Sequence, residues 1–130
     1  MKKLLGIFLL LGLFVVGTIF TQSHVSVAAQ NAVKISNAKY VKASHILVES
    51  EAQALRIKKD IENGDITFEA AAKKYSTCPS GANGGDLGYF RRNQMVKPFE
   101  DAAFSQNIGT ISNPVKTQFG YHLIKVIDKK

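Results

Sequence analysis

An apolar run near the start of the chain limits how much of its 130 residues can fold into a domain. Residues 4–20 are apolar or glycine except for Thr18, and two lysines precede them. Polar and then small residues follow, which is the order of a secretory signal covering residues 1–29 and cleaved after Ala28 or Ala29. A retained membrane anchor is the alternative, because a run of 17 residues falls just short of the ~20 that span a bilayer. Both interpretations predict that the rest is exported, to a periplasm, a cell envelope or the extracellular space.

The remaining sequence, roughly 100 residues, is enough for one small domain with a modest core. We expect residues 30–39 to form a polar tether and residues 40–130 to form the domain. Beyond the leader the chain carries 15 Lys and Arg against 10 Asp and Glu, a net charge of +5. These cations are scattered along the sequence, and an exported protein meets little nucleic acid. We therefore interpret them as solvated side chains rather than as a nucleic-acid site.

Cysteine and histidine usage excludes two kinds of feature. Cys78 is the only cysteine, so the chain has no internal disulfide. One cysteine and three widely spaced histidines do not form a metal-ligand cluster, and His24 lies in the leader. The sequence therefore predicts neither a metal nor a cofactor.

Hydrophobic periodicity predicts an α+β domain. Alternating apolar residues favour strands, and Pro114 places one of them at a sheet edge because proline cannot donate to a ladder. Ser50, followed three residues later by Gln53, is a capping box that starts the first helix. The predicted elements are a strand at 40–48, helices at 50–63 and 67–75, a loop at 76–85, a strand at 87–90, a helix at 98–104 and strands at 111–115 and 121–127.

Short motifs along this domain combine glycine turns, apolar side chains and a few polar groups. They are Ser44-His-Ile-Leu47, Cys78-Pro-Ser-Gly81, Gly84-Gly-Asp-Leu-Gly88, Gln94-Met95, Pro98-Phe-Glu-Asp-Ala102 and Phe119-Gly-Tyr-His122. With these motifs the chain from about Val41 to Val126 resembles the parvulin family of peptidyl-prolyl cis/trans isomerases, most closely its small single-domain bacterial members. The resemblance implies a parvulin-like/FKBP-like fold, in which helices surround a four-stranded, mainly antiparallel sheet in the order β-α-α-β-α-β-β.

The reaction that this resemblance implies is rotation about the bond before a proline, with no cofactor. The barrier is about 18–20 kcal/mol because the amide has partial double-bond character. An enzyme lowers it by holding the ring and by favouring the twisted amide. The resemblance assigns the proline pocket to Leu87, Met95 and Phe99, with Phe90 as a further candidate. Without the resemblance, the same side chains would be interpreted as ordinary core residues.

Four polar side chains are the catalytic candidates by the same resemblance: His45, Cys78, Thr117 and His122. The two histidines are expected to meet beneath the pocket, where they either tune its polarity or form a structural pair; both roles can hold together. Thr117 extends their hydrogen-bond chain. Cys78 is interpreted as a weakly polar group beside the substrate carbonyl, with a covalent thiolate mechanism as the alternative.

One segment departs from the phosphate-directed parvulins. They carry a basic cluster after the first strand, whereas this chain has Glu49-Ser-Glu51. No dependence on a phosphorylated residue before proline is therefore expected.

The sequence thus predicts a monomeric isomerase that acts on unfolded or loop X-Pro segments of exported proteins and assists their folding. The retained run at 4–20 would be a membrane tether. A chaperone of the same fold that holds chains without catalysis is the alternative.

Overall fold

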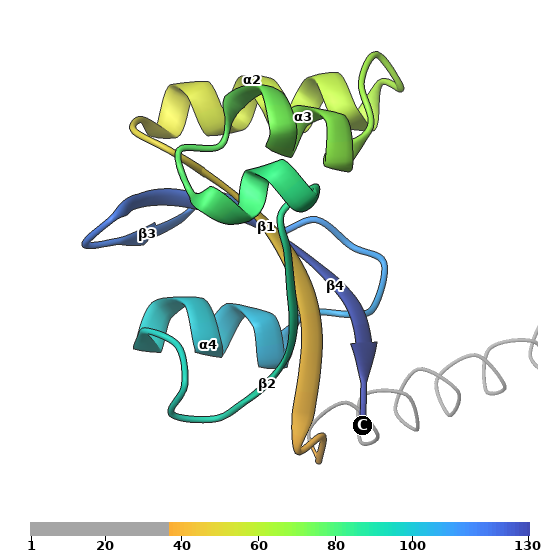
Figure 1. Ribbon diagram of the computed structural model, residues 1–130, viewed down its shortest axis with the longest axis vertical. Coiled ribbons are helices and arrows are strands. Elements are labelled where there is room, and N and C mark those ends of the chain that lie inside the picture. The colour runs from red at the N-terminus through yellow and green to blue at the C-terminus, as the bar shows by residue number, and fades with distance from the viewer. Residues whose placement is uncertain (1–36) are drawn as a thin grey trace, which may run out of the picture. The chain divides into compact units, whose positions relative to one another are not determined.

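The computed structural model describes residues 37–130 (Figure 1). The leader expected at 1–29 and most of the expected tether lie outside the described residues. Within 37–130, no helix combines the length and apolar character that crossing a bilayer requires. The elements are β1 (Tyr40–Val48), α2 (Glu51–Glu62), α3 (Phe68–Tyr75), the 3-10 helix η2 (Pro79–Asn83), β2 (Asp86–Arg91), α4 (Lys97–Ser105), β3 (Val115–Thr117) and β4 (Gly120–Lys129).

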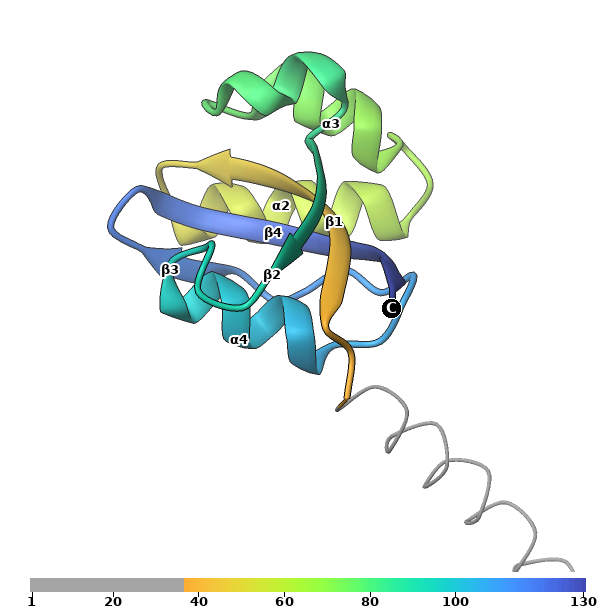
Figure 2. The same ribbon diagram turned by 60° about the horizontal axis from the view of Figure 1, so that its bottom comes forward.

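The four strands form one antiparallel sheet in the order β2-β1-β4-β3. The two longest strands, β1 and β4, lie side by side at its centre, so the first and last strands of the domain pair with each other. Helices α2 and α3 cover one face of the sheet and α4 covers the other (Figures 1 and 2). Apart from η2, the helices and strands follow in the predicted order, and they form the predicted four-stranded antiparallel sheet.

Helices on both faces explain why almost all of β1 is buried. Alternate residues of a strand point to opposite faces, so β1 contributes to two cores. Val41 and Ala43 pack with Phe90, Phe104 and Val126 on the α4 face. On the other face the core residues are Ile46, Val48, Ala54, Ile57, Phe68, Ala71, Ala72 and Leu123.

The helix ends follow the local signals in the sequence. The Ser50 hydroxyl accepts a hydrogen bond from the backbone of Gln53, and that of Thr67 accepts one from Ala70, so each helix begins with a side-chain cap. The prediction of a loop at 76–85 was wrong for residues 79–83, which form η2. Pro79 presets its first turn, and Gly81 and Gly84 donate backbone bonds three residues back.

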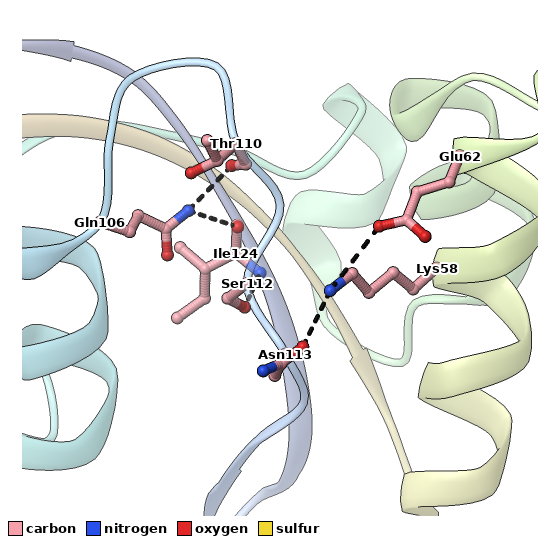
Figure 3. A network of polar contacts seen from close by, with 7 residues as sticks. All are labelled: Lys58, Glu62, Gln106, Thr110, Ser112, Asn113 and Ile124. Carbon is pink, nitrogen blue, oxygen red and sulfur yellow. Dashed lines mark hydrogen bonds and ion pairs between the residues drawn. The ribbon is translucent and has the colours of Figure 1, made fainter. Parts of the chain in front are cut away.

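The strand predicted at 111–115 is wrong for most of its length. Ile111 makes only an isolated bridge, and β3 begins at Val115. Ser112 explains the break, because its hydroxyl, not its carbonyl, accepts the Ile124 N–H (2.9 Å). Gln106 Nε2 also donates to the Ile124 carbonyl (2.9 Å), as the close-up in Figure 3 shows. The Ser112 backbone N–H still donates to the Ile124 carbonyl (2.8 Å), so a side chain replaces only the backbone acceptor of this pair, and β3 still forms the predicted sheet edge.

Two glycines let the η2 segment approach the sheet. Gly84 and Gly85 both have positive φ (70° and 83°), and the Gly85 carbonyl accepts a hydrogen bond from the His45 backbone (2.9 Å). A Cβ on Gly85 would lie 2.2 Å from the His45 carbonyl oxygen. Only glycine therefore allows this approach, which brings residues 78–80 beside β1.

Candidate functional site

A cavity of about 520 Å³ opens at the end of the sheet where β1 ends and β4 begins. Five parts of the chain form it: the β1 strand, the β4 strand, the segment leading into η2, the segment from β2 to α4, and the β3–β4 turn. Its lining residues are His45, Leu47, Thr77, Cys78, Pro79, Leu87, Gln94, Met95, Val96, Phe99, Phe119 and His122.

The wall that carries Cys78 is fixed to β1 by hydrogen bonds. The Thr77 backbone donates to the Leu47 carbonyl (2.8 Å), and the Leu47 backbone donates to the Ser76 hydroxyl (3.1 Å). Because these bonds tie residues 76–77 to the strand, the cysteine faces the same cavity as His45.

The two buried histidines meet at the floor of the cavity. Leu47 lies opposite His122 in the sheet register, and His45 lies two residues before Leu47 on the same face. The Nδ1 atoms of His45 and His122 are 3.0 Å apart, and their ring planes differ by only 17°. The edge of Phe99 contacts both rings, at centroid distances of 5.6 and 5.3 Å. This arrangement leaves the outer nitrogen of each ring, Nε2, free to form a hydrogen bond with another side chain.

Those outer nitrogens extend the pair into a chain of five side chains. His122 Nε2 lies 2.8 Å from the Thr117 hydroxyl, and His45 Nε2 lies 2.9 Å from the Ser80 hydroxyl. Ser80 in turn donates to Cys78 Sγ at 3.3 Å. A histidine pair deep in the fold is thus connected to a sulfur atom at the cavity wall.

The bond from Ser80 to Cys78 sets one consistent direction for the chain. If the Ser80 proton goes to sulfur, its oxygen accepts from His45 Nε2–H. His45 Nδ1 must then accept from His122 Nδ1–H, which leaves His122 Nε2 to accept the Thr117 hydroxyl proton. Every nitrogen of the two rings is then satisfied, which a neutral histidine pair permits and a doubly charged pair does not.

Burial keeps both histidines neutral. His45 and His122 are 5% and 4% exposed. The pKa of each is lowered from 6.5 to about 4, chiefly by desolvation, with the charge of His122 as a smaller second cause for His45. At neutral pH the site therefore presents fixed dipoles and no ionised imidazole.

The opposite wall of the cavity is apolar and comes from the β2–α4 region. Leu87 and Met95 are half-buried, and Phe99 is buried behind them. Phe99 also rests on Phe90, with centroids 6.0 Å apart. A thioether, a branched aliphatic side chain and a ring edge form a surface that suits a small apolar ring.

A buried carboxylate holds the segment that carries Met95. Glu100 is 4% exposed and accepts a hydrogen bond from the backbone of Asn93, whose φ of 68° is in the left-handed region. The Gln94 side chain accepts from the Arg91 backbone (2.7 Å). The turn that presents Met95 is therefore fixed by side-chain hydrogen bonds and not by a ladder.

The structure brings together seven of the eight site residues named from the sequence. His45, Cys78, Leu87, Met95, Phe99 and His122 line the cavity, and Thr117 supports His122 from behind. Phe90 instead lies in the core beneath Phe99 and is not a lining residue.

Sequence reasoning missed two residues of the site. Ser80 is the bridge between His45 and Cys78, and its place in Cys78-Pro-Ser-Gly81 was the only signal. Phe119 stands at the rim and is 61% exposed. A large aromatic residue next to a predicted turn glycine is a signal that was available.

Comparisons with known proteins agree with this geometry. A family model described as "Rotamase: PPIC-type PPIASE domain" matches residues 28–128. The chain is similar to the foldase protein PrsA of Exiguobacterium sibiricum, with 52% identity over 91 residues that cover 69% of this chain and 30% of that protein. The curated relatives that it matches are therefore about three times as long as the matched segment.

Two solved structures extend the comparison. The peptidylprolyl isomerase PrsA from Bacillus anthracis has a TM-score of 0.69 and 46% identity, over 75% of this chain and 45% of that chain. The solution structure of NmPin, the parvulin of Nitrosopumilus maritimus, has a TM-score of 0.64 and 43% identity, over 70% of this chain and 98% of that chain. The domain described above thus occurs both within longer proteins and nearly alone.

Proposed function

This chain belongs to the PpiC-type, or parvulin, family of peptidyl-prolyl cis/trans isomerases, and from that premise we propose that it accelerates X-Pro rotation in exported proteins and assists their folding. The family and the α+β fold expected from the sequence are confirmed. One observation carries the proposal: an apolar wall of Leu87, Met95 and Phe99 lines the same cavity as a neutral histidine pair. Such a site suits a reaction in which a bond twists and none breaks.

In the proposed reaction the prolyl ring fills the apolar wall. The carbonyl before it then lies toward Cys78 and the polar chain. As the amide twists it loses resonance, and its nitrogen gains a lone pair. A site that excludes water and offers fixed dipoles favours the twisted form over the planar one. Residues of this protein supply every group that this step uses.

The polar chain has a positioning role in this proposal. Ser80 directs a hydrogen bond onto Cys78 Sγ, and the histidines hold Ser80 in place. The sulfur then acts as a weakly polar neighbour of the carbonyl and forms no bond to the substrate. His45 and His122 support the site and the fold together.

A protease-coupled prolyl peptide assay tests the function. Met95→Ala removes part of the apolar wall from a half-buried position, so we expect a stably folded protein whose kcat/KM is lowered by about 10- to 100-fold, as the loss of 1–3 kcal/mol of ring contact requires. Met95→Leu keeps the volume and should retain most of the rate. Ile108→Ala, at an exposed side chain away from the cavity, is the control.

The same assay separates the enzyme from the alternative. If the wild-type protein shows no rate above background yet delays aggregation of an unfolded protein, it is a non-catalytic chaperone of the extracytoplasmic space. Two features favour the enzyme. The apolar wall consists of side chains that can hold a prolyl ring, and the polar side chains form a complete chain of hydrogen bonds.

We propose that the enzyme does not require phosphate before proline. β1 is followed at once by the Ser50 cap of α2, and this turn carries the exposed carboxylates Glu49 and Glu51. Like charge there would repel a phosphorylated side chain. A phosphoserine-proline peptide should be isomerised no faster than its serine-proline counterpart, and a marked gain would contradict the assignment.

Its place of action is also part of the proposal. We infer an exported monomer whose substrates are unfolded or loop X-Pro segments in a periplasm, cell envelope or extracellular space, tethered to the membrane if the run at 4–20 is retained.

A further inference from the structure

The cations of the domain are scattered in the sequence, but in the fold some of them gather at one end of the sheet. Residues 37–130 hold 14 Lys and Arg and 10 Asp and Glu. Six of these cations belong to three segments that meet at one end of the sheet: Lys39 and Lys42, Arg91 and Arg92, and Lys129 and Lys130. We call this region the cationic end. Two carboxylates, Asp101 and Asp128, lie within it, so the net charge of the described domain is concentrated there.

The backbone register places these segments side by side. Tyr40 pairs with Arg91 on one side and exchanges two backbone hydrogen bonds with Lys130 on the other (2.7 and 3.0 Å). Lys42 pairs with Tyr89 and with Asp128. In Figure 1 the start of β1 and the C-terminus lie at the same end of the domain.

Three of these cations share one open face of the sheet. Lys130 Nζ lies 4.0 Å from the centre of the Tyr89 ring, and Lys42 Nζ lies 5.9 Å from it. Arg91 is opposite Tyr40, two residues along β2 from Tyr89, and so faces the same way. The Tyr89 hydroxyl donates to Asp128 at 2.5 Å, which occupies that carboxylate.

The remaining cations surround the end of α4. Arg92 stacks over the Phe104 ring (4.4 Å), and Lys129 Nζ donates to the Phe104 carbonyl (2.8 Å). Asp101 shares a shallow hollow with Arg92 and is itself paired with Lys97 (2.5 Å). Positive charge thus extends around the end of the sheet and not over one flat face alone.

Exposed apolar side chains stand among the cations. Tyr40, Tyr89 and Ile127 are 39%, 43% and 37% exposed, and they are half of the large hydrophobic residues that are exposed within residues 37–130. Tyrosine beside lysine and arginine is the composition of protein surfaces at the boundary between lipid and water, where the ring enters the headgroup layer and the cation meets phosphate.

From these observations we infer that the cationic end is a docking surface for an anionic lipid bilayer. Charge complementarity selects an anionic partner, and cations arranged around the end of the domain, with tyrosines between them, suit a plane. If the apolar run at 4–20 is retained as an anchor, the chain between it and β1 also holds the domain near the bilayer. Only 19 residues separate Phe20, the last residue of the apolar run, from Tyr40, and that length spans at most about 65 Å.

This orientation leaves the isomerase site free. β1 runs from the cationic end to the cavity, and the five residue steps from Lys42 to Leu47 correspond to about 16 Å of strand. A domain that rests on lipid by its cationic end would therefore turn the cavity away from the membrane, toward chains arriving from solution.

Vesicle co-sedimentation of chain 34–130 tests the inference without the apolar run. This unit is compact and contains both cores, and NmPin shows that a chain of nearly this domain alone is folded. Its cooperative unfolding and isomerase rate are measured first. Vesicles of phosphatidylcholine are compared with vesicles that also contain phosphatidylglycerol. We expect binding to the anionic vesicles alone, weakening as salt rises from about 0.05 to about 0.5 M.

A matched pair of triple variants locates the surface. Lys42→Gln, Arg91→Gln and Lys130→Gln remove three charges from the open face. About fivefold in partition is expected for each cation, or about 100-fold in all. The control variant, Arg56→Gln, Lys59→Gln and Lys73→Gln, removes the same number of exposed cations from α2 and α3 and should bind as the wild type does. Both variants should keep the isomerase rate.

Three results would overturn the inference. The first is equal binding to neutral and anionic vesicles. The second is an equal loss in the control variant, which would attribute binding to net charge and not to this surface. The third is binding to an acidic polyglutamate peptide with no binding to anionic vesicles, which would make the partner an acidic chain. None of them bears on the isomerase proposal, because activity is measured separately.

Discussion

At the scale of single residues, burial decides the charge of His45 and His122, and this makes stability depend on pH. Their pKa is lowered from 6.5 to about 4 in the fold, chiefly by desolvation, so the unfolded chain binds protons first as the pH falls. The free energy of unfolding should therefore fall between about pH 6.5 and about pH 4, and these two groups should contribute no further change below that.

The expected loss across this window is about 2 to 3 kcal/mol for the pair, less than full conversion of the two shifts because the cavity opens to water. Urea unfolding at a series of pH values measures it. In His45→Phe the slope should be reduced, since one of the two groups is gone. A slope that is unchanged in this variant would assign the pH dependence to other groups.

Cys78 is the residue for which the two mechanisms predict opposite results. Its sulfur accepts a hydrogen bond from Ser80 at 3.3 Å, and a carboxylate oxygen can accept that bond as well. If the sulfur acts only through its polarity, Cys78→Asp should keep kcat/KM within about tenfold of wild type in the peptide assay. Complete loss in a stably folded Cys78→Asp protein, with activity retained in Ser80→Ala, would restore the nucleophile.

At the scale of elements, the segment between β2 and α4 controls the shape of the proline site. Glu100 fixes the turn of this segment by accepting a hydrogen bond from the Asn93 N–H, and Met95 lies two residues after Asn93. Glu100→Ala leaves that N–H without a partner and releases the turn. We expect a rise in KM of about tenfold, a smaller change in kcat, and a loss of about 1–3 kcal/mol in the free energy of unfolding.

The conservative variant separates hydrogen bonding from charge in this turn. Glu100→Gln keeps an oxygen that can accept the same bond, so it should restore most of the KM. Steady-state kinetics with urea unfolding on both variants makes the comparison. If Glu100→Gln raises KM as much as Glu100→Ala does, the turn depends on the negative charge. If neither variant raises KM, Glu100 has no positioning role.

At the scale of the whole molecule, the two cores lie within one compact unit, residues 34–130, on either face of one sheet. Because β1 and β4 pair at its centre, neither core can form without both ends of this unit. Chain 34–130 should therefore unfold in a single cooperative transition and keep the kcat/KM of the full chain. Calorimetry and the peptide assay measure this, and two transitions or a loss of rate would show that earlier residues contribute to the fold.

The local parts of this structure were accessible from the sequence because their causes are local. Ser50 and Thr67 cap their helices through bonds to residues three positions away. The apolar wall of Leu87, Met95 and Phe99 was recognised through the motifs that contain it. The strand predicted at 111–115 failed because the Ser112 hydroxyl, and not its carbonyl, accepts the Ile124 N–H, and no periodicity in the segment encodes that bond.

The sequence by itself determined the order of the helices and strands, because capping and periodicity act over a few residues, and its motifs carried the resemblance that gave the family and most of the side chains at the site. Only the tertiary structure decided which of them act together. Ser80 joins His45 across 35 positions, and Lys42 lies beside Lys130 because the first strand pairs with the last. Contacts between residues so far apart in the sequence depend on how the strands pair in the sheet. That pairing is a property of the whole chain and of no single segment.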